Sequence, residues 1–251
     1  MPRNTREQAI ILFSRLIGED NRLITMINDQ RGVFEGVLYG GRKSKLRSMI
    51  SPWHSGTVWL YSQQNNQNPK ITDFDPTIFR PSLRENLYKN IAASLVTEIV
   101  IKTQAAGENQ QTFFLLKGFL DGMEISSEEG CRKGLLRFLW RYLGLLGERP
   151  DSFYCSCCSQ PLKKNQEFFI YSPQDNGFLC QGCSLGITSP FLLSSEALEY
   201  ISMAAIESGA RARTMELSPE SYDQLRNFIF YLITNSVNTK IKTFEAGIGI
   251  L

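Results

Sequence analysis

The stretch ITDFDPTIFRPSLRENLYKNIAASLVTEIV, residues 71–100, changes its pattern at Pro81 and thereby decides the fold class. Before that proline, KITDF at 70–74 is a short strand-like segment. After it, Ser82-Leu83-Arg84-Glu85 has the form of a capping box, in which the Ser82 hydroxyl bonds the Glu85 amide. Apolar residues then recur at intervals of four, as on one stripe of an amphipathic helix: Leu83, Leu87, Ile91, Leu95 and Ile99. Strands before the proline and helices after it predict an α+β protein.

Upstream of this stretch the chain is made of further strand-like runs, rich in apolar, β-branched and aromatic residues. They lie at 9–15, 22–29, 33–39 and 49–63, and Pro52 must lie at the edge of the last run or at a bulge. Five short strands without intervening helices favour a small barrel over a doubly wound sheet. We expect a five-stranded OB-fold barrel, with an SH3-like barrel as the alternative.

Downstream the chain is predicted to be helical. A helix is expected at 110–123, and Ser126 or Ser127 should cap another that is apolar around most of its circumference. Further helices are expected at 195–208 and at 219–235, the latter with Ser218 as N-cap and Pro219 as its first residue. The predicted organisation is an OB-fold domain at 1–80 and a helical domain at 81–251 that contains a cysteine module at 153–185.

Five of the six cysteines fall between positions 155 and 183. Cys155-x-x-Cys158 and Cys180-x-x-Cys183 are two knuckles that supply four thiolates, a complete tetrahedral shell for Zn²⁺. A closed shell of four thiolates leaves no position for water, so the predicted zinc is structural. Reduced, metal-free cysteines or one redox-active pair are the alternatives. Cys157 is left outside the site and Cys131 is interpreted as a packing residue.

The net charge of +2 is unevenly distributed along the chain. Residues 1–80 hold 11 Lys and Arg against 7 Asp and Glu, whereas residues 81–251 hold 16 against 18. Directly after the turn Gly40-Gly41, four cations fall within six residues: Arg42, Lys43, Lys45 and Arg47. Such a loop can neutralise phosphates with little sequence choice, and a barrel can add stacking aromatics. The sequence therefore predicts a nucleic-acid site, with a solvated surface loop as the alternative.

Several aromatic residues are near enough to this loop in sequence to stack on bases, although burial in the barrel is the more common fate of each. They are Tyr39, Trp53, Trp59 and Tyr61.

An enzymatic function has little support in the sequence. His54 is the one histidine, and no P-loop, dinucleotide fingerprint, G-x-S-x-G or H-E-x-x-H motif is present. No stretch approaches the ~18 apolar residues of a membrane span, and the first residues lack the apolar core of a secretory signal. We expect a non-enzymatic cytoplasmic protein. A zinc-ribbon and OB-barrel RNA factor in transcription or translation, or a zinc-dependent nucleic-acid-processing enzyme, are the rival hypotheses.

Over roughly residues 10–185 the chain resembles the RecO family of recombination mediators. Five segments carry the resemblance: GEDNRLIT at 18–25, LYGGRKSKLRSMISPW at 38–53, RFLWRYLGLLG at 137–147, Cys155 to Leu162, and YSPQDNGFLCQGC at 171–183. Leu139, Ser159 and Trp53 stand where the family usually has glutamate, glycine and phenylalanine. After about residue 185 the chain is similar to the family only in its helical pattern.

The resemblance implies a bacterial, nucleoid-associated mediator that binds single- and double-stranded DNA and anneals complementary strands. With RecR, such a protein helps RecA replace single-strand-binding protein. By the same resemblance, the four cations of the loop contact phosphates, with Arg22 as a weaker candidate. It also implies that the helical domain receives the acidic tail of single-strand-binding protein at Arg137. Lys133, Arg137 and Arg141 recur every four residues as one basic stripe, for which a solvated helix face is the alternative.

Overall fold

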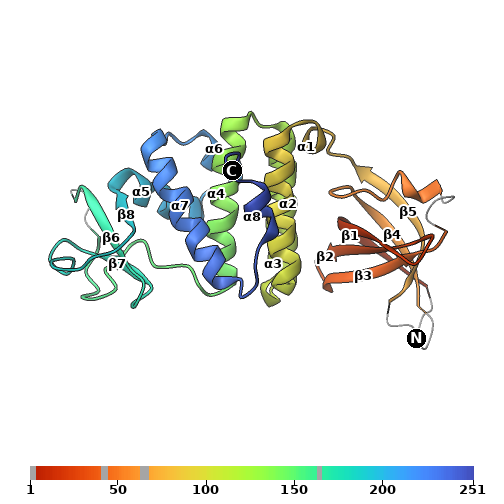
Figure 1. The fold of residues 1–251 in the computed structure, drawn as a ribbon, viewed down its shortest axis with the longest axis horizontal. Coiled ribbons are helices and arrows are strands. Elements are labelled where there is room, and N and C mark those ends of the chain that lie inside the picture. The colour runs from red at the N-terminus through yellow and green to blue at the C-terminus, as the bar shows by residue number, and fades with distance from the viewer. Residues whose placement is uncertain (1–3, 41–44, 63–67, 163–165) are drawn as a thin grey trace. The chain divides into compact units, whose positions relative to one another are not determined.

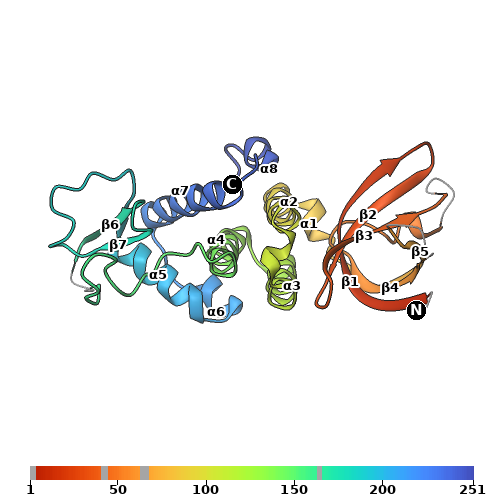
Figure 2. The same cartoon turned by 90° about the horizontal axis from the view of Figure 1, so that it is seen from below.

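The described residues between 4 and 78 include five strands that close into a barrel. The structure is a computed structural model that describes residues 4–40, 45–62, 68–162 and 166–251. In Figures 1 and 2 the five strands curl into a barrel. The strands are β1 (Asn4–Ile17), β2 (Asn21–Asn28), β3 (Gly32–Leu38), β4 (Ser55–Tyr61) and β5 (Lys70–Ile78), with a short 3-10 helix at Lys45–Arg47.

The strand order around the barrel is β1-β2-β3-β5-β4, and β4 closes back on β1. All pairs are antiparallel except β3 with β5. This closed five-stranded arrangement, with a non-sequential neighbour pair, is the predicted OB barrel rather than the SH3-like alternative. Pro52 lies before β4 rather than within it, as a residue without an N–H should. The side chains of Ile11, Ile24, Met26, Val58 and Phe74 are buried together inside the barrel.

The predicted capping box after the barrel is wrong. Helix α1 (Ser82–Glu85) has no side-chain cap bond, and the Ser82 hydroxyl donates instead to Glu124, 2.6 Å from Oε2. The chain then breaks at Asn86, whose side chain accepts from the Lys89 N–H and starts α2 (Leu87–Lys102). Because of this break the predicted apolar stripe is interrupted, and Leu87 is 64% exposed.

Polar contacts join the barrel to the helices that follow it. Arg80, two residues after β5, donates to Asp121 on α3 (Asn109–Ile125), and Trp53 donates its indole N–H to Thr97 on α2. The Glu98 carboxylate accepts backbone N–H groups at the start of α8 (Lys242–Ala246). Residues 1–124 and 242–251 accordingly form one compact unit.

Residues 125–241 form a second compact unit around α4 (Glu128–Leu145). Ser127 is the N-cap of α4, whose side chains Leu136, Leu139 and Trp140 are fully buried, as the sequence predicted. In Figure 2, α7 lies on one side of α4, and α5 and α6 lie on the other. The remaining elements of this unit are α5 (Ser195–Ile206), α6 (Gly209–Thr214), α7 (Pro219–Ser236), β6 (Phe168–Ser172), β7 (Gly177–Leu179) and β8 (Leu192–Ser194).

The caps of α7 agree with the sequence, with Ser218 as N-cap and Pro219 as the first helical residue. Helix α6 and helix α8 were not expected, because six and five residues are too few to show a period. The predicted domain boundary at residue 80 stays a prediction, since the two compact units describe packing rather than independent folding.

Candidate metal centre and nucleic-acid interface

Cys155, Cys158, Cys180 and Cys183 converge on one point. Their sulfur atoms all lie within 4.8 Å of one another, and Cys158 Sγ is 3.7 Å from Cys180 Sγ. Four sulfurs held about 2.3 Å from one zinc ion in a tetrahedron are roughly 3.8 Å apart. The donor set and its spacing therefore fit a divalent metal bound by four thiolates.

Backbone hydrogen bonds fix both knuckles. The first is a tight loop in which the Cys155 N–H donates to Gln160 O at 2.8 Å, and the Ser159 N–H donates back to Cys155 O at 2.9 Å. The second follows β7 directly, and the Cys183 N–H donates to Cys180 O at 3.1 Å. The Ser156 N–H donates to Phe178 O at 2.9 Å and so joins the first knuckle to the strand that carries the second.

Gly177 permits the close approach of the two knuckles. A Cβ atom at this position would lie 2.5 Å from the Ser156 Cβ, so any larger residue would push the knuckles apart.

The local electrostatics favour a thiolate at Cys155. Burial of this side chain acts to raise its pKa, but N–H groups of Cys158, Cys180 and Cys157 point at the sulfur and lower the pKa to about 6. Cys183 shows the opposite direction, because crowding by the Cys180 and Cys158 thiols raises its pKa. Four thiolates this close repel one another, and a bound cation relieves that repulsion.

The two other cysteines lie outside this quartet. Cys157 is exposed, and Cys131 is fully buried in the first turn of α4 with its thiol 3.7 Å from Ser126 O. Both placements agree with the sequence interpretation.

The predicted phosphate loop is described in part. Arg42 and Lys43 lie outside the described residues, and only the backbone of Lys45 is described. Arg47 is exposed, whereas Leu46 and Met49 on either side of it pack against the barrel core. These two contacts hold residues 46–49 against the barrel and leave the Arg47 side chain exposed to solvent. Arg22, on β2, is half-buried, and a phosphate contact by any of these five residues stays a prediction.

The barrel aromatics divide into exposed and buried rings. Tyr39 is exposed, with Lys70 Nζ 5.7 Å from its ring centroid, and Trp59 is half-buried with Arg6 5.4 Å from its ring centroid. Trp53, in contrast, is 6% exposed. Tyr39 and Trp59 therefore combine a ring with an adjacent cation, the pairing that single-strand binding uses.

Arg137 lies in a cluster of arginines between α4 and α6. Its Nε and Nη2 donate to Glu207 O at 3.3 and 2.8 Å. Burial, followed by the charges of Arg141 and Arg213, lowers the pKa of Arg137 to about 10. The sequence analysis did not identify Arg213, because it did not predict α6. Ser208 was the feature that could have revealed this helix, since it is the N-cap and its side chain accepts from the N–H of Arg211, three residues later.

Lys133 does not contribute to this cluster as an available charge. It is buried and its Nζ lies 2.7 Å from Glu129 Oε1, so the predicted three-residue basic stripe is reduced to Arg137 and Arg141.

His54 is held as a neutral imidazole. An Arg84 guanidinium nitrogen lies 3.1 Å from its Nε2, and because guanidinium only donates, Nε2 must accept. The Nδ1–H therefore donates to Met49 O at 2.7 Å. Burial first, and then the charges of Arg84 and Arg80, lower the pKa of His54 below 6.5. Both ring nitrogens are occupied by the protein itself.

The fold and the site define a class, that of OB-barrel proteins with a four-cysteine module in a helical region. Comparison with known families places the chain within this class. Residues 1–77 match the model of the recombination protein O N-terminal domain, and residues 84–244 match that of its C-terminal domain. The chain belongs to the RecO family of DNA repair proteins.

Individual relatives agree with this assignment. The DNA repair protein RecO of Leptospira biflexa serovar Patoc (strain Patoc 1 / Ames) is 31% identical over 182 residues, which cover 71% of this chain and 72% of that protein. The proteins of the same name from Desulforamulus reducens and Bacillus subtilis (strain 168) are 25% and 24% identical, over 94% and 71% of this chain and 91% and 68% of theirs. Among the described residues, no helix is both long and apolar enough to cross a membrane.

Proposed function

We propose that this protein binds single- and double-stranded DNA, anneals complementary strands and, together with RecR, helps load RecA onto DNA coated by single-strand-binding protein. The observation that supports this most directly is the closed five-stranded OB barrel, which carries the exposed Arg47 on the segment after β3. OB barrels bind single strands through cationic grooves and stacking aromatics. The site of action would be the bacterial cytoplasm, in association with the nucleoid.

The proposed role is binding without catalytic turnover. His54 is the one histidine of the chain, and both of its ring nitrogens are engaged by Met49 and Arg84. A general base needs a free nitrogen within reach of a substrate proton. The four-cysteine site, if filled, has no open position for a substrate oxygen.

We further propose that the four cysteines hold a structural Zn²⁺. The sulfur spacing and the N–H groups directed at Cys155 support this assignment. Zinc bound there would join the loop at 155–158 to the loop at 180–183 and so stabilise the β6–β7 hairpin between them. The chain's own contribution is the pair of hydrogen-bonded knuckles that bring the thiolates together.

The arginine cluster of α4 and α6 supports a docking site for the acidic tail of single-strand-binding protein. The mutual repulsion of Arg137, Arg141 and Arg213 would be relieved by a carboxylate ligand. Arg137→Ala and Arg141→Ala should each weaken binding of the tail peptide about tenfold or more. Arg132→Ala is the matched control, since Arg132 lies on the same helix but pairs with Glu128. Unchanged affinity in both cluster variants would contradict this docking site.

The decisive experiment is annealing of complementary oligonucleotides coated with single-strand-binding protein. We expect the protein to accelerate annealing, and expect the variant with alanine at Arg42, Lys43, Lys45 and Arg47 to lose that acceleration while remaining folded. The salt dependence of its single-strand affinity should also become shallower, since each lost phosphate contact removes roughly 0.7 from the slope.

A variant with alanine at Arg132, Arg211, Arg226 and Lys240, all in the other compact unit, removes the same four positive charges and controls for the loss of net charge. Absence of annealing by the folded wild-type protein, together with a preference for structured RNA, would favour an RNA-binding factor instead.

A further inference from the structure

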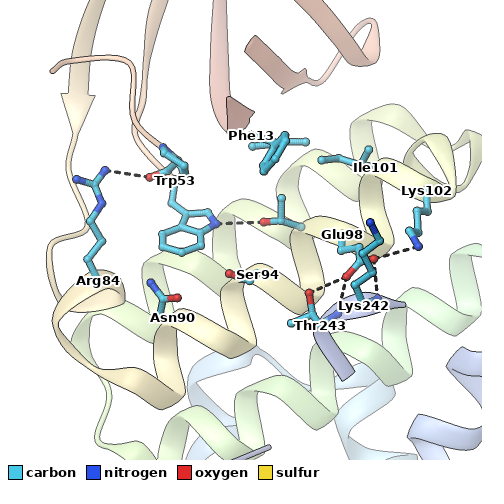
Figure 3. A pocket seen from close by; sticks show the side chains of 13 residues that line it. Phe13, Trp53, Arg84, Asn90, Ser94, Glu98, Ile101, Lys102, Lys242 and Thr243 are labelled. Atoms are coloured by element: carbon cyan, nitrogen blue, oxygen red, sulfur yellow. Dashed lines mark hydrogen bonds and ion pairs between the residues drawn. The ribbon is translucent and has the colours of Figure 1, made fainter. Parts of the chain in front are cut away.

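A pocket of about 570 Å³ lies within the first compact unit, where the barrel packs on α2. Figure 3 shows Phe13 and Trp53 on the barrel side of this pocket, and Ser94, Glu98 and Ile101 on the side of α2. Its volume is within the range of small-ligand sites, and like them it is mostly apolar with a few polar groups. No residue of the pocket takes part in the contacts proposed above for DNA, metal or the acidic tail.

Two aromatic rings of the barrel are placed at this pocket by irregular backbone. The pairing of β1 with β2 shifts register between Ile11 and Phe13, and the Phe13 side chain is 50% exposed whereas Leu12 beside it is buried. Bulges of this kind redirect side chains and recur beside functional sites. An aromatic face is therefore left open to solvent at the mouth of an apolar pocket.

Trp53 is held in place by an unusual backbone conformation and by three hydrogen bonds. Its φ is 67°, a left-handed conformation that is costly for a bulky residue. Its N–H donates to Ile11 O at 2.7 Å, its indole N–H donates to Thr97 Oγ1 at 3.1 Å, and its carbonyl accepts from Arg80. The indole is thus a rigid wall of the pocket, positioned before any ligand arrives.

Helix α2 contributes polar side chains to this mostly apolar pocket. Asn90, Ser94 and Thr97 line it at helical spacing, and the apolar Ile101 follows one turn later. Asn90 and Ser94 are half-buried, and an amide and a hydroxyl together offer donors and acceptors to a flat polar edge. An apolar ligand alone would leave these groups unsatisfied.

The rim of the pocket carries an excess of positive charge. Arg84, Lys102 and Lys242 line it together with one carboxylate, Glu98. That carboxylate is already engaged by Lys102 at 3.0 Å and by the N–H groups of Lys242 and Thr243. Arg84 lies 3.1 Å from a neutral imidazole nitrogen rather than from an anion. The rim is therefore complementary to a ligand that combines an aromatic group with negative charge.

We propose that this pocket receives one unstacked base of a bound DNA single strand. The base would stack on Phe13 and against Trp53, present its hydrogen-bonding edge to Asn90 and Ser94, and place its flanking phosphates near Arg84 and Lys242. This inference rests on the proposed DNA-binding function. A base is favoured over an acidic peptide because the segment that carries the exposed Arg47 continues to Pro52 and Trp53, which line the pocket, and six residues span at most about 20 Å, a length that a few nucleotides cover.

The test uses the full-length protein and oligothymidylates with a single 2-aminopurine at successive positions. We expect wild-type protein to change the fluorescence at one position far more than at the others, because one base leaves the stack. Phe13→Ala should abolish that contrast and weaken binding by about fivefold or more. Ser94→Phe, which fills the pocket from α2, should do the same without removing any contact of the barrel.

Phe114→Ala is the matched control, since Phe114 is an exposed aromatic residue of α3 in the same compact unit. It should leave both affinity and fluorescence unchanged, and thermal unfolding would establish that all three variants are folded. If Ser94→Phe does not fold, the smaller Ser94→Leu replaces it.

The outcomes separate this inference from the function on which it rests. Binding that depends on the four loop cations but not on Phe13 or Ser94 would overturn the base pocket and leave the proposed function standing. Failure of wild-type protein to bind the strand would overturn both. If an acidic peptide ending in an aromatic residue binds wild-type protein, is blocked by Ser94→Phe and leaves DNA binding unaffected, the pocket is a peptide site and the base assignment is wrong.

Discussion

Thr243 donates both its backbone N–H and its hydroxyl to one oxygen of the Glu98 carboxylate, at 2.8 and 2.6 Å, although 145 residues separate them in the chain. The other carboxylate oxygen accepts the Lys242 N–H at 2.9 Å. These are N–H groups at the start of α8, which have no partner inside their own helix. Glu98 therefore caps α8 from α2 and fastens the end of the chain to the helix that follows the barrel.

Glu98→Gln should weaken this attachment in a pH-dependent way. Burial acts to raise the pKa of Glu98, but hydrogen bonds from Thr243, Lys242 and Lys102 lower it to about 2 from 4.5. The carboxylate thus stabilises the fold fully above 4.5, and that stabilisation is lost as the pH falls from 4.5 towards 2. We expect the variant to be less stable by about 1 kcal/mol at neutral pH, and the difference to shrink in acid.

Urea unfolding measures the difference in stability between the Glu98→Gln variant and the wild type. It is carried out at neutral pH and again in acid, between the ordinary pKa of 4.5 and the lowered pKa of about 2. Glu220→Gln, at the start of α7, serves as the control and should show little effect at either pH. A difference between wild type and Glu98→Gln that is equally large in acid would contradict the role of the charged carboxylate.

The imidazole of His54 should titrate below 6.5. A lowered pKa in the folded state means that the unfolded chain binds the proton first, so stability falls as the pH drops below 6.5 and levels off once folded His54 is also protonated. Because the chain has one histidine, a single imidazole signal in the NMR spectrum reports this titration. Arg84→Ala should raise the pKa by removing a neighbouring positive charge. A pKa of 6.5 or higher in the wild type would disprove the neutral assignment.

Asp121→Ala should destabilise the first compact unit by about 2 kcal/mol, because it leaves the buried Arg80 guanidinium with one charged partner fewer. The Arg80 side chain is 1% exposed and lies 2.5 Å from Asp121, which is itself 36% exposed. Asp223→Ala removes an ion pair on the surface of α7 and should cost less than about 0.5 kcal/mol. Equal effects of the two substitutions on urea unfolding would show that the buried pair makes no special contribution.

Cys158→Ser should abolish binding of about one zinc ion per chain and lower the thermal stability of the second compact unit. Cys157→Ser, one residue away, should leave both unchanged, since Cys157 lies outside the quartet. Metal content and calorimetric unfolding measure these effects, and a chelator should reproduce the Cys158→Ser result in the wild type. Zinc binding that is retained by Cys158→Ser but lost by Cys157→Ser would mean that the first knuckle binds the metal through Cys155 and Cys157 instead of Cys155 and Cys158.

Local chemistry explains why much of this protein could be predicted from its sequence. The strands of the barrel, the helix starts at Ser127 and Ser218, and each of the two cysteine knuckles depend on residues within a few positions of one another. A two-residue spacer brings two thiols together whatever the rest of the fold does. The same holds for an N-cap, whose hydroxyl reaches an N–H three residues ahead.

Contacts between distant residues were decided only by the tertiary structure. Ser82 and Glu85 have the sequence of a capping box, yet the Ser82 hydroxyl bonds Glu124, 42 residues away, because two packed helices bring that carboxylate within reach. The grouping of Arg213 with Arg137 and the capping of α8 by Glu98 have the same origin. The pocket beside Phe13 also needs a barrel strand and α2 to meet. A sequence pattern indicates which hydrogen bonds residues close together in the chain can form. Packing determines whether a polar group bonds such a neighbour or a distant residue that the fold brings closer.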